Sequence, residues 1–199
     1  MDEPEEPEKA APPAMRRVFE ELEAEFEAGL RREAEQETVA ALRAGIGETV
    51  LWEQLARRAG THAIAHAGTR RFHGIVVASY PEFLVLHDGD GTEHLVRYGP
   101  ATSVALPAEA ATLRPAPAAA ARRYRLSLAL RELARRRDPV RVELVDGGRV
   151  DGTIEAVGSD YLEVAEHDPG EARRRRAVKA RRFLGLAAVT AVTLPPARR

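Results

Sequence analysis

The chain has 199 residues, and its composition excludes several classes of protein. It contains no cysteine, which excludes a disulfide scaffold, thiolate zinc sites, iron–sulfur clusters and a cysteine nucleophile. The 30 basic and 31 acidic side chains nearly cancel, but residues 1–50 carry a net charge of −8, residues 51–120 carry 0 and residues 121–199 carry +7. This asymmetry indicates either a basic surface for an anionic partner or an attraction between the two ends of the chain.

Hydrophobic residues make up 44% of the chain, which is enough to form a core and excludes wholesale disorder. No apolar run approaches the roughly 20 residues that a helix needs to span a bilayer, and the N-terminus is acidic where a signal peptide is basic. We therefore expect a cytoplasmic protein without membrane contact. Arginine outnumbers lysine by 28 to 2, which is typical of a GC-rich genome and by itself is weak evidence for nucleic-acid binding.

The first 44 residues predict a tail followed by a helix. Residues 1–14 combine Pro, Glu and Ala without apolar periodicity, so we expect a disordered acidic tail. Residues 15–44 contain no Pro and carry an apolar stripe at a spacing of four, which predicts a long N-terminal helix. The stripe is a candidate docking surface for the rest of the chain, for a second copy or for a protein partner, and it consists of Val18, Leu22, Phe26 and Leu30.

The rest of the chain contains an internal repeat, which is the strongest signal in the sequence. Three segments match at an offset of 78 residues, and two closing segments match at 88, because the second copy has ten additional residues. The matched pairs are 52–58 with 130–136, 71–76 with 149–154, 82–86 with 160–164, 95–96 with 183–184 and 104–107 with 192–195. The repeat predicts two related domains, residues 45–110 and 122–195, with a Pro/Ala linker at 111–121 and a basic insertion at 168–179.

Each copy has the pattern of a short helix followed by about five short strands. Residues 140–144 alternate between apolar and charged, as in a half-buried strand, and residues 146–148 (Asp-Gly-Gly) predict a hairpin turn. Gly74 and Gly152 fall inside predicted strands, where glycine marks a bend or a close backbone approach. Strands this short close most economically into small barrels without exposed edges. The predicted fold class is mainly β with helices (α+β): two tandem small β-barrels, each preceded by a short helix, plus the long N-terminal helix.

The strand and turn pattern resembles the Sm-like (LSm) small barrel, one of the SH3-like β-barrels. The resemblance covers most of residues 48–106 and 122–194 and rests on Val140, Val142, Leu144, Asp146, Gly147, Gly152, Ile154, Val157, Asp160, Tyr161, Leu162 and Val164. It implies a small-barrel fold, assembly of copies into a ring, and single-stranded, often uridine-rich RNA as ligand. The family's RNA pocket uses an Asn directly after the motif Asp and an Arg-Gly pair in the closing motif. Here Asp160 is followed by Tyr161, and residues 183–186 read Phe-Leu-Gly-Leu, so no pocket residue carries over. A looser resemblance is to uncharacterised actinobacterial proteins, some of them described as transcriptional regulators.

A basic cluster around the insertion is the candidate nucleic-acid site. It consists of Arg173, Arg174, Arg175, Arg176, Lys179, Arg181 and Arg182. Arginines in a loop beside a barrel can neutralise the phosphates of RNA or DNA and release counterions. The alternative is a solvated hairpin whose charge the acidic helix balances. We expect Tyr161 and Phe183 in the core, which argues against a platform that stacks bases.

Five of the six histidines fall in the first copy: His62, His66, His73, His87 and His94. At the offset of 78, His62 and His66 align with Val140 and Leu144 and share one face of a strand. With an aspartate of residues 88–91 nearby, they are candidate ligands for a divalent metal. A helical His pair with a Glu base is missing, however, and we expect partly exposed strand histidines and no metal site.

Catalytic motifs are missing from the sequence, which has no Gly-x-Ser-x-Gly elbow, phosphate loop or dinucleotide fingerprint. Residues 88–91 (Asp-Gly-Asp-Gly) resemble the start of a calcium loop but lack its terminal Glu, so they predict a hairpin turn. We therefore expect no catalytic residue and no cofactor. The leading hypothesis is a non-enzymatic regulatory or scaffold protein that contacts nucleic acid through the basic cluster. The alternatives are an adaptor that docks a partner or a second copy through the N-terminal helix, and a small-molecule or metal sensor that uses the histidines.

Overall fold

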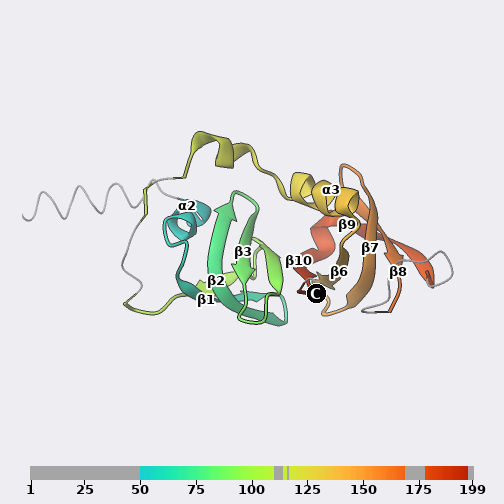
Figure 1. Ribbon diagram of the computed structural model, residues 1–199, viewed down its shortest axis with the longest axis horizontal. Helices are drawn as coiled ribbons and strands as arrows, with labels where there is room; N and C mark the ends of the chain where they lie inside the picture. Colours follow the sequence, from blue (N-terminus) through green and yellow to red (C-terminus); the bar gives the residue numbers. More distant parts are fainter. Residues whose placement is uncertain (1–49, 110–113, 116, 169–177, 197–199) are drawn as a thin grey trace, which may run out of the picture. The chain divides into compact units, whose positions relative to one another are not determined.

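The computed structural model describes residues 50–109, 114–115, 117–168 and 178–196, and these contain two α-helices and ten strands (Figure 1). The first half, residues 50–109, has α2 (Leu51–Ala56), β1 (His62–Ala67), β2 (Arg70–Tyr80), β3 (Phe83–His87), β4 (Glu93–Arg97) and β5 (Ser103–Ala105). The second half, residues 117–196, has the 3-10 helix η2 (Ala119–Arg123), α3 (Leu126–Arg136), β6 (Pro139–Leu144), β7 (Arg149–Val157), β8 (Tyr161–Glu166), β9 (Ala180–Gly185), the 3-10 helix η3 (Leu186–Ala188) and β10 (Val189–Leu194).

All ten strands belong to one antiparallel sheet, in the order β5-β1-β2-β3-β4-β10-β6-β7-β8-β9. The two halves meet where β10, the last strand of the second half, pairs with both β6 and β4. We call the β4–β10 pairing the junction. Within it Val192 lies opposite Leu95, and Ala191 lies opposite Val96. The sheet is therefore continuous from one half to the other.

The predicted fold class is wrong. The sequence predicts separate tandem barrels and a long N-terminal helix, whereas the described residues form a single sheet with one short and one longer α-helix. The physical reason is that a strand has hydrogen-bonding groups along both edges, and β10 satisfies one edge with β6 and the other with β4. The predicted tail (1–14) and helix (15–44) lie outside the described residues. The domain boundaries 45–110, 111–121 and 122–195 stay a prediction.

The two halves share one strand order. The first runs β5-β1-β2-β3-β4, and the second runs β10-β6-β7-β8-β9. Leu84 lies opposite Val96 in the first half, as Leu162 lies opposite Leu184 in the second. Both β2 and β7 also have a register shift at the same place in their pairing with the following strand. These matches define equivalent positions, in which β4 corresponds to β9 and β5 corresponds to β10.

The glycines inside the strands lie where the backbones approach closely, which confirms the prediction for Gly74 and Gly152. A Cβ added at Gly152 would clash with the carbonyl oxygen of Ala165, and one added at Gly74 would lie 2.6 Å from that of His87. The hairpin at residues 146–148 is confirmed as well, because it joins β6 to β7 and places Gly147 at a φ of 84°. The close approach and the turn each depend on which residues occupy one or a few neighbouring positions, so a short stretch of sequence predicts them.

Strand β1 is displaced by one residue from its predicted alignment. Ala63 lies opposite Gly74, just as Val140 lies opposite Gly152, so Val140 corresponds to Ala63 and not to His62. A shift of one residue moves every side chain of a strand to its other face. His62 and His66 are therefore exposed, while the alanines that alternate with them are buried. Counted from the matched helix residues Leu55 and Leu133, the chain reaches Ala63 after eight residues and Val140 after seven, so the first half has one extra residue before β1, which the alignment at a constant offset overlooks.

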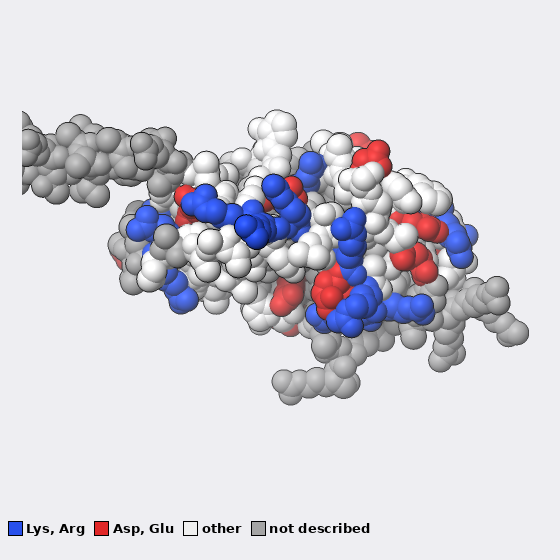
Figure 2. Space-filling model, turned by 90° about the horizontal axis from the view of Figure 1, so that it is seen from above, with Lys and Arg blue, Asp and Glu red and all other residues white. Residues whose placement is uncertain are grey.

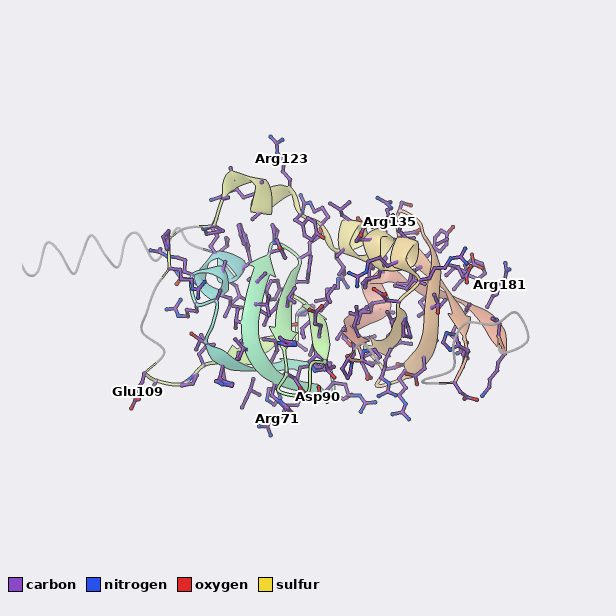
Figure 3. The ribbon with its side chains drawn as sticks, viewed as in Figure 1. Arg71, Asp90, Glu109, Arg123, Arg135 and Arg181 are labelled. Carbon is purple, nitrogen blue, oxygen red and sulfur yellow. The ribbon has the colours of Figure 1, made fainter. Side chains whose placement is uncertain are left out.

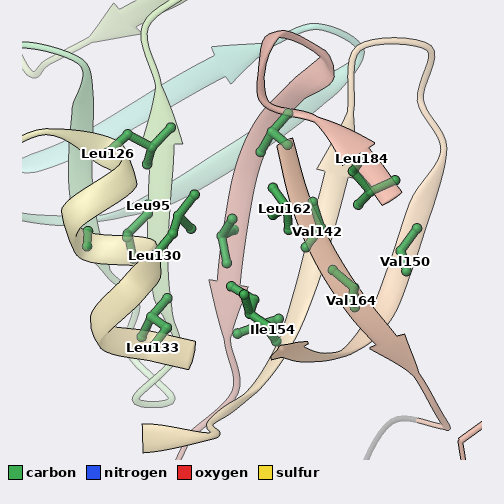
Figure 4. Close-up of a cluster of buried hydrophobic side chains, with 14 of the residues drawn as sticks. Leu95, Leu126, Leu130, Leu133, Val142, Val150, Ile154, Leu162, Val164 and Leu184 are labelled. Carbon is green, nitrogen blue, oxygen red and sulfur yellow. The ribbon is translucent and has the colours of Figure 1, made fainter. Parts of the chain in front are cut away.

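Two clusters of buried side chains form the core, and each extends across the junction. The larger cluster fills the second half and also contains Phe83 and Leu95 from the first half (Figure 4). The smaller cluster fills the first half and takes Ala191 from β10. The junction is therefore held by apolar packing as well as by backbone hydrogen bonds.

Helix α3 buries one face and leaves the other in solvent. Leu126, Leu130 and Leu133, at spacings of four and three, all point into the larger core cluster. The backbone N–H of Leu126 donates to Glu82 Oε2 at 2.8 Å, so a side chain of the first half caps this helix. Among the described residues, no helix is both long enough and apolar enough to cross a membrane.

Candidate functional site

The described members of the predicted basic cluster are paired with carboxylates. The pairs, with nitrogen–oxygen distances up to 3.4 Å, are Lys179–Asp168, Arg181–Glu163 and Arg182–Glu166. The other members, Arg173, Arg174, Arg175 and Arg176, lie outside the described residues. The assignment of this cluster to nucleic acid stays a prediction, and its described part carries less free positive charge than the sequence alone indicates.

A second basic surface, outside the predicted basic cluster, runs along η2 and α3. We call it the arginine face; it consists of Arg122, Arg123, Arg125, Arg131, Arg135, Arg136 and Arg137, all exposed. Residues 122–137 contain a single acid, Glu132. Seen from above, arginine side chains gather over this side of the molecule (Figure 2). The signal in the sequence was a run of arginines interleaved with the leucines of an amphipathic helix.

Four arginines of this face have acidic partners. The ion pairs are Arg122–Glu53, Arg125–Glu82, Arg135–Glu132 and Arg136–Asp138. The hydrogen bond from Arg135 lowers the pKa of Glu132 below its ordinary value, so this acid stays ionised. In the described part of the chain, Arg123, Arg131 and Arg137 have no carboxylate within salt-bridge distance. Figure 3 shows Arg123 projecting from η2 away from the sheet, toward solvent.

A cavity of about 670 Å³ opens in the first half beside β5. His62, His73, His87 and Asp88 line it together with apolar side chains such as Ile64. His73 Nδ1 lies 4.0 Å from Asp88 Oδ2, which is too long for a hydrogen bond. Among the described residues, no three His, Asp or Glu side chains converge closely enough to hold a metal ion. The cavity offers imidazoles to a polar ligand, and the hypothesis of a sensor that uses the histidines stays a prediction.

His94 lies at the junction and differs from the histidines of the cavity. Its Nδ1 lies 3.0 Å from Thr193 Oγ1 on β10, and its ring packs against Phe72 at 5.3 Å between centroids. Burial lowers the pKa of His94 below its ordinary value, and the charge of Asp88 opposes this shift while His73 adds to it. The neutral imidazole is therefore the form that fits the folded junction.

Two aromatic side chains lie exposed on the outer strands of the second half. Tyr161 begins β8 and Phe183 lies on β9, with ring centroids 5.8 Å apart. Both are exposed, so the prediction that they belong to the core is wrong. Their counterparts in the first half, Phe83 and Leu95, are buried at the junction. No local pattern in the sequence distinguishes the two environments.

The predicted docking stripe of Val18, Leu22, Phe26 and Leu30 lies outside the described residues, and the adaptor hypothesis that rests on it stays a prediction. The resemblance to Sm-like proteins stays a prediction too. Comparison with protein-family models gave no match, and comparison with curated proteins gave none either.

Proposed function

We propose that the protein is a non-enzymatic scaffold that associates with nucleic acid through the arginine face. The observation that carries the proposal is the charge of residues 122–137, which hold seven exposed arginines and one acid. Three of these arginines have no carboxylate partner in the described part of the chain. In water their charge is balanced by mobile anions, which a phosphate backbone displaces with a gain in entropy.

The arginine face is held on a fixed support. The buried side chains of Leu126, Leu130 and Leu133 anchor α3 in the core. The backbone of Arg131, on the opposite face of α3, is therefore held in place before any ligand binds. A planar guanidinium also matches the geometry of phosphate oxygens and donates two parallel hydrogen bonds to them. Less side-chain and backbone freedom is then lost on binding than for arginines in an unstructured loop.

The aromatic rings near this face are engaged in the protein's own packing. Tyr124 lies against Tyr80 at 4.7 Å between centroids, and Arg122 covers the ring of Trp52 at 5.7 Å. The face therefore offers charge without free stacking surfaces. We infer contacts to the sugar–phosphate backbone, with little preference for base sequence.

The test measures binding of a labelled single-stranded RNA and a duplex DNA to the full chain by fluorescence anisotropy at several salt concentrations. The double variant Arg123→Gln with Arg131→Gln removes two unpaired arginines of the face. If both contact phosphates, the slope of log K against log salt becomes less steep by about 1.4 for a single strand and about 1.8 for a duplex.

A matched control is the double variant Arg71→Gln with Arg149→Gln, which removes two exposed arginines outside the arginine face. Figure 3 places Arg71 on the side of the molecule opposite Arg123. The control variant should leave the slope unchanged. The proposal fails if the wild-type chain binds neither ligand at low salt, or if both double variants weaken binding equally. A slope that changes only in an Arg173–Arg176→Ser variant would place the contact on the insertion and overturn the assignment to the arginine face.

A further inference from the structure

The cavity of about 670 Å³ beside β5 has a floor and walls of different chemistry. Two rows of residues that lie opposite one another cross it. In one row Ile64 of β1 lies opposite His73 of β2, and in the next Ile75 of β2 lies between His62 of β1 and His87 of β3. Side chains of residues directly opposite in a sheet share one face. The cavity therefore combines two isoleucines with three imidazoles on a single face of the sheet.

The second half carries a different set of residues at the same place in its fold. The positions equivalent to Ile64 and His73 are those of Arg141 and Asp151, which also lie opposite each other. Arg141 Nε donates to Asp151 Oδ1 at 2.7 Å, so these two side chains satisfy each other. In the first half His73 faces an isoleucine, which offers it no hydrogen bond, and its side chain is 69% exposed. An ion pair in one half is thus replaced by an apolar residue and an accessible imidazole in the other.

We propose that the cavity binds a small organic acid, with the apolar body of the acid on the isoleucines and its carboxylate on the imidazoles. Cavities of about 300–1,000 Å³ that are mostly apolar and carry a few polar groups are the usual sites for small molecules. Burial of the apolar body supplies affinity, and the imidazoles fix the position of the carboxylate. This inference does not rest on the proposed function, which concerns the arginine face.

The polar groups of the cavity favour an anion of small size. An imidazole N–H donates to a carboxylate, and His62, His73 and His87 each carry one. The acidic lining residue, Asp88, accepts the backbone N–H of Asp90 at 2.8 Å and is largely buried, so its carboxylate is engaged in its own turn. Among the described residues that line the cavity, none is Lys or Arg, which a chain of phosphates requires.

The charge that balances the bound acid comes from the imidazoles themselves. The charged and titratable groups around the cavity histidines are His66, Arg71, Asp88, Asp90, Glu93 and His94. Their acids outnumber their arginine, so this face has no net positive charge while the imidazoles are neutral. A bound carboxylate therefore favours imidazoles that take up a proton. Affinity for the acid should rise by about 3-fold or more between pH 8 and pH 6, where imidazole titrates.

The experiment titrates cinnamate, an ionised acid with a flat apolar body, into the full chain and follows the histidine ring signals by NMR. The expected dissociation constant is about 0.1–1 mM, which suits a ligand of this size. The signals of His62, His73 and His87 should shift together. His167, which is buried in the second half, is the internal control and should not move.

Two further compounds separate the contributions of the charge and of the apolar body. Cinnamyl alcohol keeps the body and lacks the carboxylate, whereas acetate keeps the carboxylate and lacks the body. Each should bind at least about 5-fold more weakly than cinnamate, because a hydrogen bond to a charged group and the burial of an aromatic ring are each worth about this factor or more.

Matched variants on the same strands locate the site. His62→Gln should weaken cinnamate binding by about 5-fold, while His66→Gln changes an exposed histidine of β1 outside the cavity and should leave binding intact. Ile75→Asp should abolish binding, while Val77→Asp, at the next exposed position of β2, should not affect it. All four residues are exposed, and an unchanged circular dichroism spectrum will show that the variants fold.

The proposal is overturned if the three cavity imidazoles do not respond to about 10 mM cinnamate, a concentration well above the expected dissociation constant. It is also overturned if the alcohol binds as tightly as the acid, if affinity does not rise toward pH 6, or if His66→Gln weakens binding as much as His62→Gln. Binding that is lost in the Arg123→Gln and Arg131→Gln double variant would place the acid on the arginine face and overturn the assignment to the cavity.

Discussion

The junction and the outer edge of β9, which we call the free edge because no strand of the described residues pairs with it, present equivalent positions in opposite environments. Leu95 is 7% exposed at the junction, while its counterpart Phe183 is 65% exposed at the free edge. The two strands have the same place in their halves, and Phe183 is the larger apolar side chain. The difference shows that burial at these positions is decided by whether a second five-stranded unit pairs with the strand, and not by the hydrophobicity of the side chain.

The largest expected effect concerns these two residues directly. Leu95→Ala should lower the free energy of unfolding by about 3 kcal/mol, because it removes a buried side chain and leaves a cavity at the junction. Phe183→Ala should change it by less than about 0.5 kcal/mol in dilute protein, where the edge is in solvent. Urea unfolding followed by circular dichroism measures both. Similar losses for the two variants would contradict the proposed difference between the sites.

A smaller effect is expected from the ion pair between Arg70 of β2 and Glu143 of β6, which links the two halves beside the junction. Glu143→Gln keeps the shape of the side chain but leaves Arg70 without its carboxylate, and it should cost about 2 kcal/mol, since Arg70 is 39% exposed and partly solvated. Glu163→Gln is the matched control in the second half, because its partner Arg181 is largely exposed. The control should cost under about 0.5 kcal/mol. Equal costs would show that the junction pair is no more stabilising than a surface pair.

The smallest expected effect is a dependence on pH. The folded chain lowers the pKa of His94, so below the ordinary pKa of 6.5 the unfolded chain binds more protons and stability falls as the pH falls. The melting temperature of the wild-type chain should therefore decrease between pH 7.5 and pH 5.5, and it should decrease less in His94→Gln. The same slope in His94→Gln and in the wild type would remove His94 as the cause.

Local features were predictable because they depend on a few neighbouring residues. The turns at 88–91 and 146–148 need aspartate and glycine, and the close approach at Gly152 excludes any Cβ, so both are visible in a short window. The register of β1 was not predictable from a constant offset, because one extra loop residue moves every side chain to the other face. The arginine face was visible as a run of basic residues, but its pairing with carboxylates distant in the sequence was not.

The sequence by itself determined the order of the strands and helices within each half, since periodicity and turn residues are local properties of the chain. Only the tertiary structure decided that the halves share one sheet, because either edge of β10 is able to pair with another strand. As a result Leu95 is buried and Phe183 is exposed, and among the described residues the outer edges of β5 and β9 have no strand partner. Hydrogen bonds between strands join residues far apart in the chain, and no short stretch of sequence specifies them.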